Sequence, residues 1–165
     1  MRKFILLAAL ALAISCPAPA RASILDIPPP LKGQKSLRLF TVPGVVTAGG
    51  LGTFFSCTNR SSSPATISVE LYVEDGGAAC NDASAVAVTA APGATVMFAT
   101  QNTADSSFFS SVPLSTPPAY LALGSASILS TSKSVVCNAF IADVYNSPPL
   151  SMATLKAIGK KQVGD

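Results

Sequence analysis

Short apolar runs separated by turn-forming residues recur along most of this chain. In residues 65–74 apolar and polar side chains alternate strictly, with Ile67, Val69, Leu71 and Val73 on one side. A period of two is typical of a β-strand with one buried face and one wet face. The same rhythm predicts strands at residues 37–42, 51–58, 85–89, 95–100, 125–129, 135–144 and 152–158, the last with a short helix as the alternative.

Turn-forming residues stand between these runs. Residues 59–64 predict a hairpin loop that pairs the second and third strands antiparallel, and Gly76-Gly77 predicts a turn after the third. The run at 135–144 is apolar on both faces, so we expect a central or covered strand there. The pattern as a whole predicts an all-β fold, an antiparallel β-sandwich of seven to eight strands over residues 36–158.

The first 22 residues have the features of an export signal. Two cations precede an uninterrupted apolar run at residues 4–14, and residues 20–22 (Ala-Arg-Ala) give the small-x-small pattern that signal peptidases cut after. The run is too short to cross a bilayer, which takes about 20 apolar residues. We expect a cleaved signal peptide at 1–22 and a mature protein, secreted or periplasmic, that begins at Ser23.

The mature chain then divides into three parts and carries balanced charge. Residues 23–35 predict a Pro-rich extended lead-in, 36–158 the sandwich, and 159–165 a C-terminal tail. Three of the eleven Lys and Arg residues lie in the signal, which leaves eight cations against eight acids. A neutral surface has no long-range field to steer nucleic acid or anionic lipid. No later stretch is apolar and long enough to span a membrane.

Three cysteines remain after the signal, so one disulfide and one leftover thiol are expected in an oxidising compartment. If the second and third strands pair, Cys80 lies roughly 20 Å from Cys57, whereas a disulfide needs Cα atoms within about 7 Å. We therefore favour Cys57–Cys137, and keep a bridge to Cys80 or buried thiols as alternatives. Residues 13–16 loosely resemble a lipobox, so a lipid tether at Cys16 stays open.

The long segment 101–119 has no regular pattern and carries Phe108 and Phe109. Insertions of this length are uncommon in compact domains and are sometimes functional. Either the segment folds back and plugs one end of the core, or its tip, with Phe108 and Phe109, contacts a partner.

The absence of histidine from the chain excludes whole classes of site. Ser-His-Asp and Cys-His catalysis both need an imidazole, and histidine-based zinc and copper sites are excluded with them. A Ser-Lys dyad at residues 132–134 has weak support, because these residues fall in a predicted turn. Glu70 and Glu74 would stand about 13 Å apart along one strand, which is too far for a glycosidase pair. We expect both to be solvated.

Two ligand classes stay open as alternatives. Glu74-Asp75 with Asn81-Asp82 could gather oxygen ligands around calcium, although such a loop is more often a plain turn. Aromatic side chains could stack on a sugar ring, and the candidates are Tyr72, Tyr120 and Tyr145. We expect no bound cofactor.

Three short segments carry a resemblance. Residues 54–59 (FFSCTN), 136–140 (VCNAF) and 148–152 (PPLSM) resemble those of short exported bacterial β-proteins of uncharacterised function. The order of strands, with one cysteine early and one late, is similar to an immunoglobulin-like sandwich, although the core tryptophan is missing. The resemblance implies no catalytic residues. The expected function is a non-enzymatic binding or structural module of the cell envelope, with a carbohydrate- or calcium-binding module as the alternative.

Overall fold

The computed structural model describes residues 24–74, 79–103, 112–114 and 121–159. All regular secondary structure in these ranges is β-strand, as the sequence pattern predicts. The strands are β1 (Leu37–Ala48), β2 (Leu51–Asn59), β3 (Ala65–Tyr72), β4 (Val88–Ala90), β5 (Thr95–Ala99), β6 (Val112–Pro113), β7 (Leu121–Ser130), β8 (Val135–Asp143), β9 (Met152–Leu155) and β10 (Ile158–Gly159).

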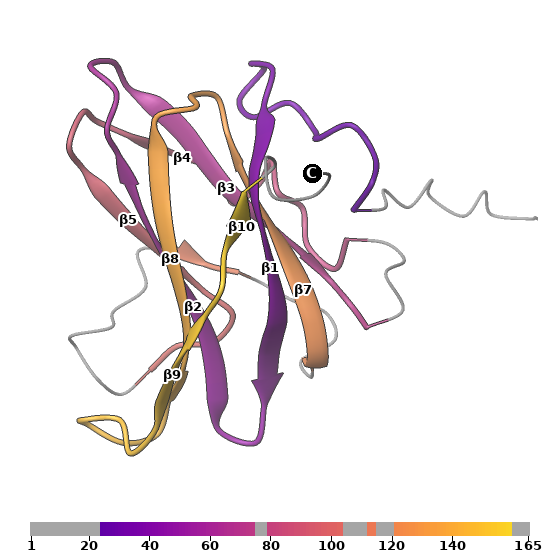
Figure 1. Ribbon diagram of the computed structural model, residues 1–165, viewed down its shortest axis with the longest axis vertical. Helices are drawn as coiled ribbons and strands as arrows, with labels where there is room; N and C mark the ends of the chain where they lie inside the picture. The colour runs from indigo at the N-terminus through magenta and orange to yellow at the C-terminus, as the bar shows by residue number, and fades with distance from the viewer. Residues whose placement is uncertain (1–23, 75–78, 104–111, 115–120, 160–165) are drawn as a thin grey trace, which may run out of the picture.

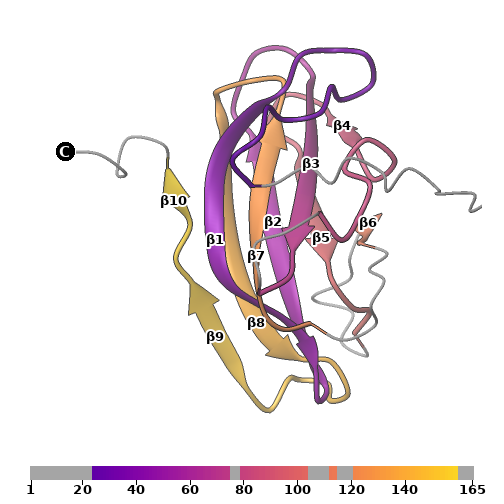
Figure 2. The same cartoon turned by 90° about the vertical axis from the view of Figure 1, so that its right-hand side faces the viewer.

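The strands form one 10-stranded sheet that curls into a near-barrel (Figures 1 and 2). Its main path runs β4-β3-β7-β1-β2-β5-β6, with β8 on the other edge of β2 and β9 beside β8. β10 pairs with β1, so the β9–β10 segment crosses from one half of the sheet to the other. The separate antiparallel layers of a sandwich are not confirmed, because the sheet is continuous and β5 pairs with β6 in parallel.

The predicted hairpin between the second and third strands is wrong. β2 pairs with β1, β5 and β8, whereas β3 pairs with β4 and β7. Residues 60–64 instead cross over, held by the buried Asn59 side chain. Its amide donates to the carbonyls of Ser63 (2.8 Å) and Ala90 (3.0 Å), and its Oδ1 accepts from the Ser61 amide (2.9 Å). A buried amide that satisfies three backbone groups fixes this crossing better than a plain turn would.

The hairpin of β2 is made with β1. Gly49 and Gly50 form its two-residue turn, with φ of 58° and 81°. Positive φ at both central residues is the conformation that two-residue hairpin turns need, and glycine adopts it without a steric penalty. β1 therefore continues to Ala48, well past residue 42, where the sequence predicted its end.

β3 is buried on both faces, which corrects the expectation of a wet face. Ile67, Val69 and Leu71 lie in the main core, as predicted. On the opposite face Glu70 is 3% exposed and Tyr72 is 0% exposed. The polar residues of this alternating pattern therefore lie on a second face of β3, which is also covered.

Residues 24–36, named here the N-terminal strap, cover that second face together with residues 79–87. Leu31, fully buried, packs in a small cluster with Ala83, Ala87 and Leu129. Hydrogen bonds join the two covering segments to each other and to β3, from Ser84 Oγ to the Pro30 carbonyl (3.1 Å) and from Ser68 Oγ to the Ala83 carbonyl (2.6 Å). The Pro-rich lead-in is thus an integral part of the fold.

Two other strand boundaries have local causes. Asp82 Oδ1 accepts from the amides of Ser84 (2.9 Å) and Ala85 (3.2 Å), so a turn replaces the start of the strand predicted at 85–89. At the C-terminal end, the predicted strand is confirmed in two short pieces, β9 and β10.

Candidate functional site

A half-open groove lies between the strap and the first half of β1. Residues 24–28, 35–41 and the two residues of β10 line it, and its volume is about 830 Å³. Most of its walls are apolar, which is typical of pockets for small molecules or for apolar segments of a partner. In Figure 2 the strap curves over the upper end of β1, and β10 lies to the left of β1.

Local sequence explains why the groove stays open. Pro28-Pro29-Pro30 favours an extended backbone, and it leads away from β1 before the chain turns back at Lys32 and Gly33, both with positive φ. β10 pairs with β1 at Phe40 and Thr41 and forms the other end of the groove lining. The groove therefore occupies the space beside the start of β1.

Two large aliphatic side chains on the groove wall are almost fully exposed. Leu25 is 88% exposed and Ile27 is 89% exposed. Single exposed apolar residues are common, but two of them on the wall of an apolar groove mark an interaction surface. Their place in the Pro-rich lead-in is the signal by which the sequence could have suggested this site.

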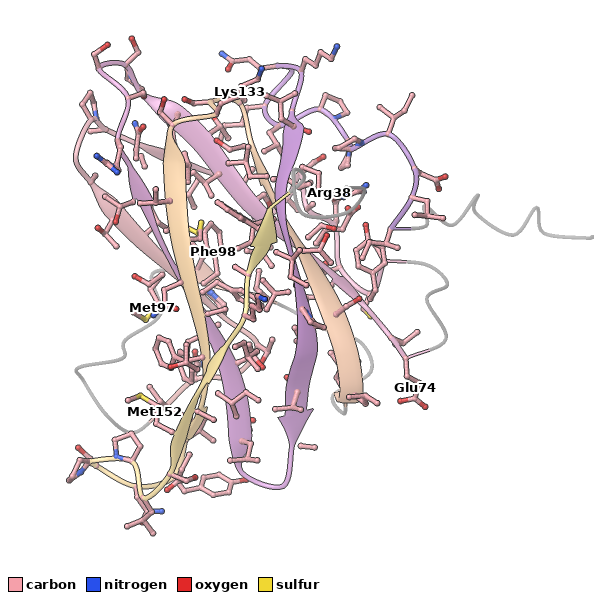
Figure 3. All side chains as sticks on the ribbon, viewed as in Figure 1. Arg38, Glu74, Met97, Phe98, Lys133 and Met152 are labelled. Carbon is pink, nitrogen blue, oxygen red and sulfur yellow. A yellow bond between two sulfur atoms is a disulfide. The ribbon has the colours of Figure 1, made fainter. Side chains whose placement is uncertain are left out.

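Arg38 connects the groove to the covered face of β3. It lies at the start of β1, beside the strap (Figure 3). Its Nη2 donates to the Asp26 backbone carbonyl (3.2 Å) and lies 3.9 Å from Glu70 Oε2. Tyr72 Oη donates a short hydrogen bond to the same Glu70 oxygen. Among the described residues, the buried Arg38 Nε has no hydrogen-bond partner.

The environment of Tyr72 shifts its acidity strongly. Burial, followed by the hydrogen bond and the negative charge of Glu70, raises the pKa of Tyr72 well above its ordinary value of 10.0. A tyrosine buried in this way stays protonated in the folded state when the unfolded chain has already ionised. It serves to hold Glu70, and it is not available for sugar stacking.

We expect the stability of the fold to decrease as pH rises above about 10. Between the unfolded and folded pKa values of Tyr72, the unfolded chain binds fewer protons, so stability falls as pH rises and is fully present below the unfolded value. Urea unfolding across alkaline pH measures this slope. Tyr72→Phe should flatten the alkaline part and remove the late-titrating tyrosinate absorbance. An identical slope in Tyr145→Phe and Tyr72→Phe would contradict this assignment, because Tyr145 is 71% exposed.

The structure contains the favoured disulfide. Cys57 on β2 and Cys137 on β8 stand directly opposite each other, with a Cα–Cα distance of 4.1 Å. Cys80 is half-buried and takes no part in it. The expected pairing is therefore present, although the hairpin used to argue for it is not.

Several predicted site residues lie outside the described residues, among them Cys16, Asp75, Phe108, Phe109 and Tyr120. The end of the long segment agrees with a plug at the core. Leu114 is buried in the main core, and its amide donates to the Ala99 carbonyl (2.7 Å). Whether a partner contacts Phe108 and Phe109 stays a prediction.

The described residues give little support to the calcium site or to the sugar-stacking site that the sequence left open. The Asn81 side chain pairs with the backbone of β3 at Val69 and Leu71 (2.8 Å each), and Asp82 caps its own turn. In the ranges the structure describes, no three His, Cys, Asp or Glu side chains gather as metal ligands. Tyr145 is exposed, and its ring lies beside Gly50 in the β1–β2 turn.

The Ser-Lys candidate falls in the β7–β8 connection, where Ser132 Oγ accepts from the Ser134 amide (3.2 Å), as a turn would require. Lys133 is exposed there (Figure 3).

The described ranges contain no helix of the length and apolarity that crossing a membrane requires. No protein-family model, curated protein or solved structure matches this chain.

Proposed function

We propose that this protein is an exported, non-enzymatic binding module of the cell envelope and that the groove beside β1 is its binding surface. The observation that carries the proposal is the exposed apolar wall of the groove, with Ile27 89% exposed. An exposed apolar concavity costs solubility unless something covers it. Export is supported by the residues of the leader and by the disulfide, since disulfides persist in oxidising compartments.

A binding role fits the chemistry of the chain better than catalysis does. The sequence has no histidine. The ionisable groups that do converge are Arg38, Glu70 and Tyr72, and of these Glu70 and Tyr72 are buried. A catalytic group must reach its substrate, and the Glu70 carboxylate and Tyr72 hydroxyl are instead used to hold the covered face together. The antiparallel sandwich and its immunoglobulin-like character remain part of this proposal.

Expression of the full chain in a bacterium tests the export step. We expect the mass of the protein in the periplasm or medium to correspond to a chain that begins at Ser23. A membrane-bound product that begins at a lipidated Cys16 would instead establish the tether, and an intact leader in the cytoplasm would contradict export.

Capture from solubilised envelope, with the exported product as bait, tests the binding step. Ile27→Asp should abolish capture while leaving the fold intact, because the side chain is almost fully exposed. Leu150→Asp is the matched control, since Leu150 is 82% exposed and does not line the groove. Equal capture by all three proteins would place the binding surface elsewhere.

A further inference from the structure

We propose that the groove binds a long-chain fatty acid, with the chain on the apolar wall and the carboxylate at Lys35 and Arg38. This inference rests on the proposed function, because it names the ligand of the same groove. Residues 35–41 line the groove over seven positions, and an extended backbone of that length spans roughly 20 Å. An apolar groove of this length suits an unbranched chain.

The apolar wall supplies the chain contact. Leu25 and Ile27 face Leu39, Phe40 and Ile158 around the same groove. Residues 37–41 of β1 are half-buried, and Leu25 and Ile27 of the strap are nearly fully exposed. A chain laid between the two sides would remove both from water, and burial of apolar area is the main driving force of such binding.

The charges on the wall favour a negative head group. Lys35 and Arg38 line the groove against a single acid, Asp26. Arg38 faces Glu70 at 3.9 Å, too far for a hydrogen bond, and its side chain is 19% exposed. The exposed part of the guanidinium can therefore meet a ligand, and carboxylates are the groups a guanidinium binds best. Lys35 is exposed at the rim and adds attraction at longer range.

Isothermal titration of the exported protein with dodecanoate below its micelle concentration tests the inference, with dodecanol as the neutral analogue. We expect saturable binding of dodecanoate and binding of dodecanol that is several-fold weaker. Ile27→Asp should weaken dodecanoate by about tenfold or more, because one buried aliphatic side chain accounts for at least that factor. Leu150→Asp, which changes an equally exposed leucine outside the groove, should have no effect.

A second pair of variants tests the head group. Lys35→Gln should weaken dodecanoate roughly threefold to tenfold at low salt, less at high salt, and leave dodecanol unchanged. Lys133→Gln is the matched control, since Lys133 is exposed and lies outside the groove lining.

The outcomes separate this inference from the proposed function. Equal affinity for dodecanoate and dodecanol overturns the charged head group, and dodecanoate binding unaffected by Ile27→Asp overturns its location. If neither amphiphile binds, the fatty-acid inference is wrong, while envelope capture that is lost with Ile27→Asp still upholds the groove as a binding surface. If capture also fails to respond to Ile27→Asp, the proposed site of binding is wrong as well.

Discussion

Replacing both disulfide cysteines, Cys57→Ala with Cys137→Ala, is expected to lower the free energy of unfolding by about 4 to 5 kcal/mol. The two residues are 80 apart in sequence, so their link removes a large loop entropy from the unfolded chain. A loss of this size lowers the melting temperature on the order of 10 °C. Urea unfolding of parent and variant under non-reducing conditions measures the difference. The double substitution avoids leaving one thiol unpaired in the core.

Two controls isolate the contribution of the disulfide. Cys80→Ala removes a half-buried thiol that is outside the bridge, and it should cost less than about 1 kcal/mol. Reductant should destabilise the parent and leave the double variant unchanged. If parent and double variant unfold at the same urea concentration, the Cys57–Cys137 bridge does not contribute as the structure implies.

The strands themselves were predictable because their cause is local. A period of two in residues 65–74 requires a strand whatever lies around it. The two cysteines of the disulfide could also be predicted from the sequence, since both lie inside predicted strands and could meet across the fold. Pairing between strands is a non-local property. The crossing at 60–64 depends on Asn59 reaching the Ala90 carbonyl, and nothing in the local sequence specifies that contact.

The covered face of β3 shows a second limit of sequence patterns. Alternation separates polar from apolar residues, but it does not say what lies above the polar ones. Glu70 and Tyr72 satisfy each other, so burying them costs less than burying either alone. The covering segment, in turn, looked like a linker because of its prolines. Leu31 is the residue that ties it down, and a single apolar residue in a Pro-rich stretch gives no periodic signal.

The shape of the groove could not be predicted from the sequence for the same reason, although Leu25 and Ile27 in the Pro-rich lead-in are a local sign of an apolar surface there. It exists because the strap returns to the sheet at Leu31 while residues 24–28 form the opposite wall and reach β1 through the hydrogen bond from Arg38 to the Asp26 carbonyl. The balanced net charge of the chain also gave no indication that cations outnumber acids on the groove wall. Equal numbers of cations and acids say nothing of their placement, and here Lys35 and Arg38 face one acid across the groove.

Glu70→Ala is expected to destabilise the fold by about 3 kcal/mol, at the lower end of what breaking a buried ion pair costs. The substitution leaves Tyr72 Oη without its acceptor in a layer closed to water, and it removes the carboxylate nearest the Arg38 guanidinium. The lower end applies because the Arg38 side chain is 19% exposed and stands 3.9 Å from Glu70, so water already screens part of the pair. Urea unfolding measures the loss.

Glu70→Gln separates the contribution of the charge from that of the hydrogen bond, and Glu74→Ala is the exposed control. A glutamine amide at this position would keep an acceptor for Tyr72 and lose only the charge, so Glu70→Gln should cost about 1 to 2 kcal/mol. Glu74 follows β3 in the same alternation but is exposed, and Glu74→Ala should stay within about 0.5 kcal/mol. A double-mutant cycle of Glu70→Gln with Tyr72→Phe should then show coupling, because the two side chains share one hydrogen bond. Equal costs for Glu70→Ala and Glu74→Ala would mean that water reaches both carboxylates, and that the strap does not cover β3 in solution.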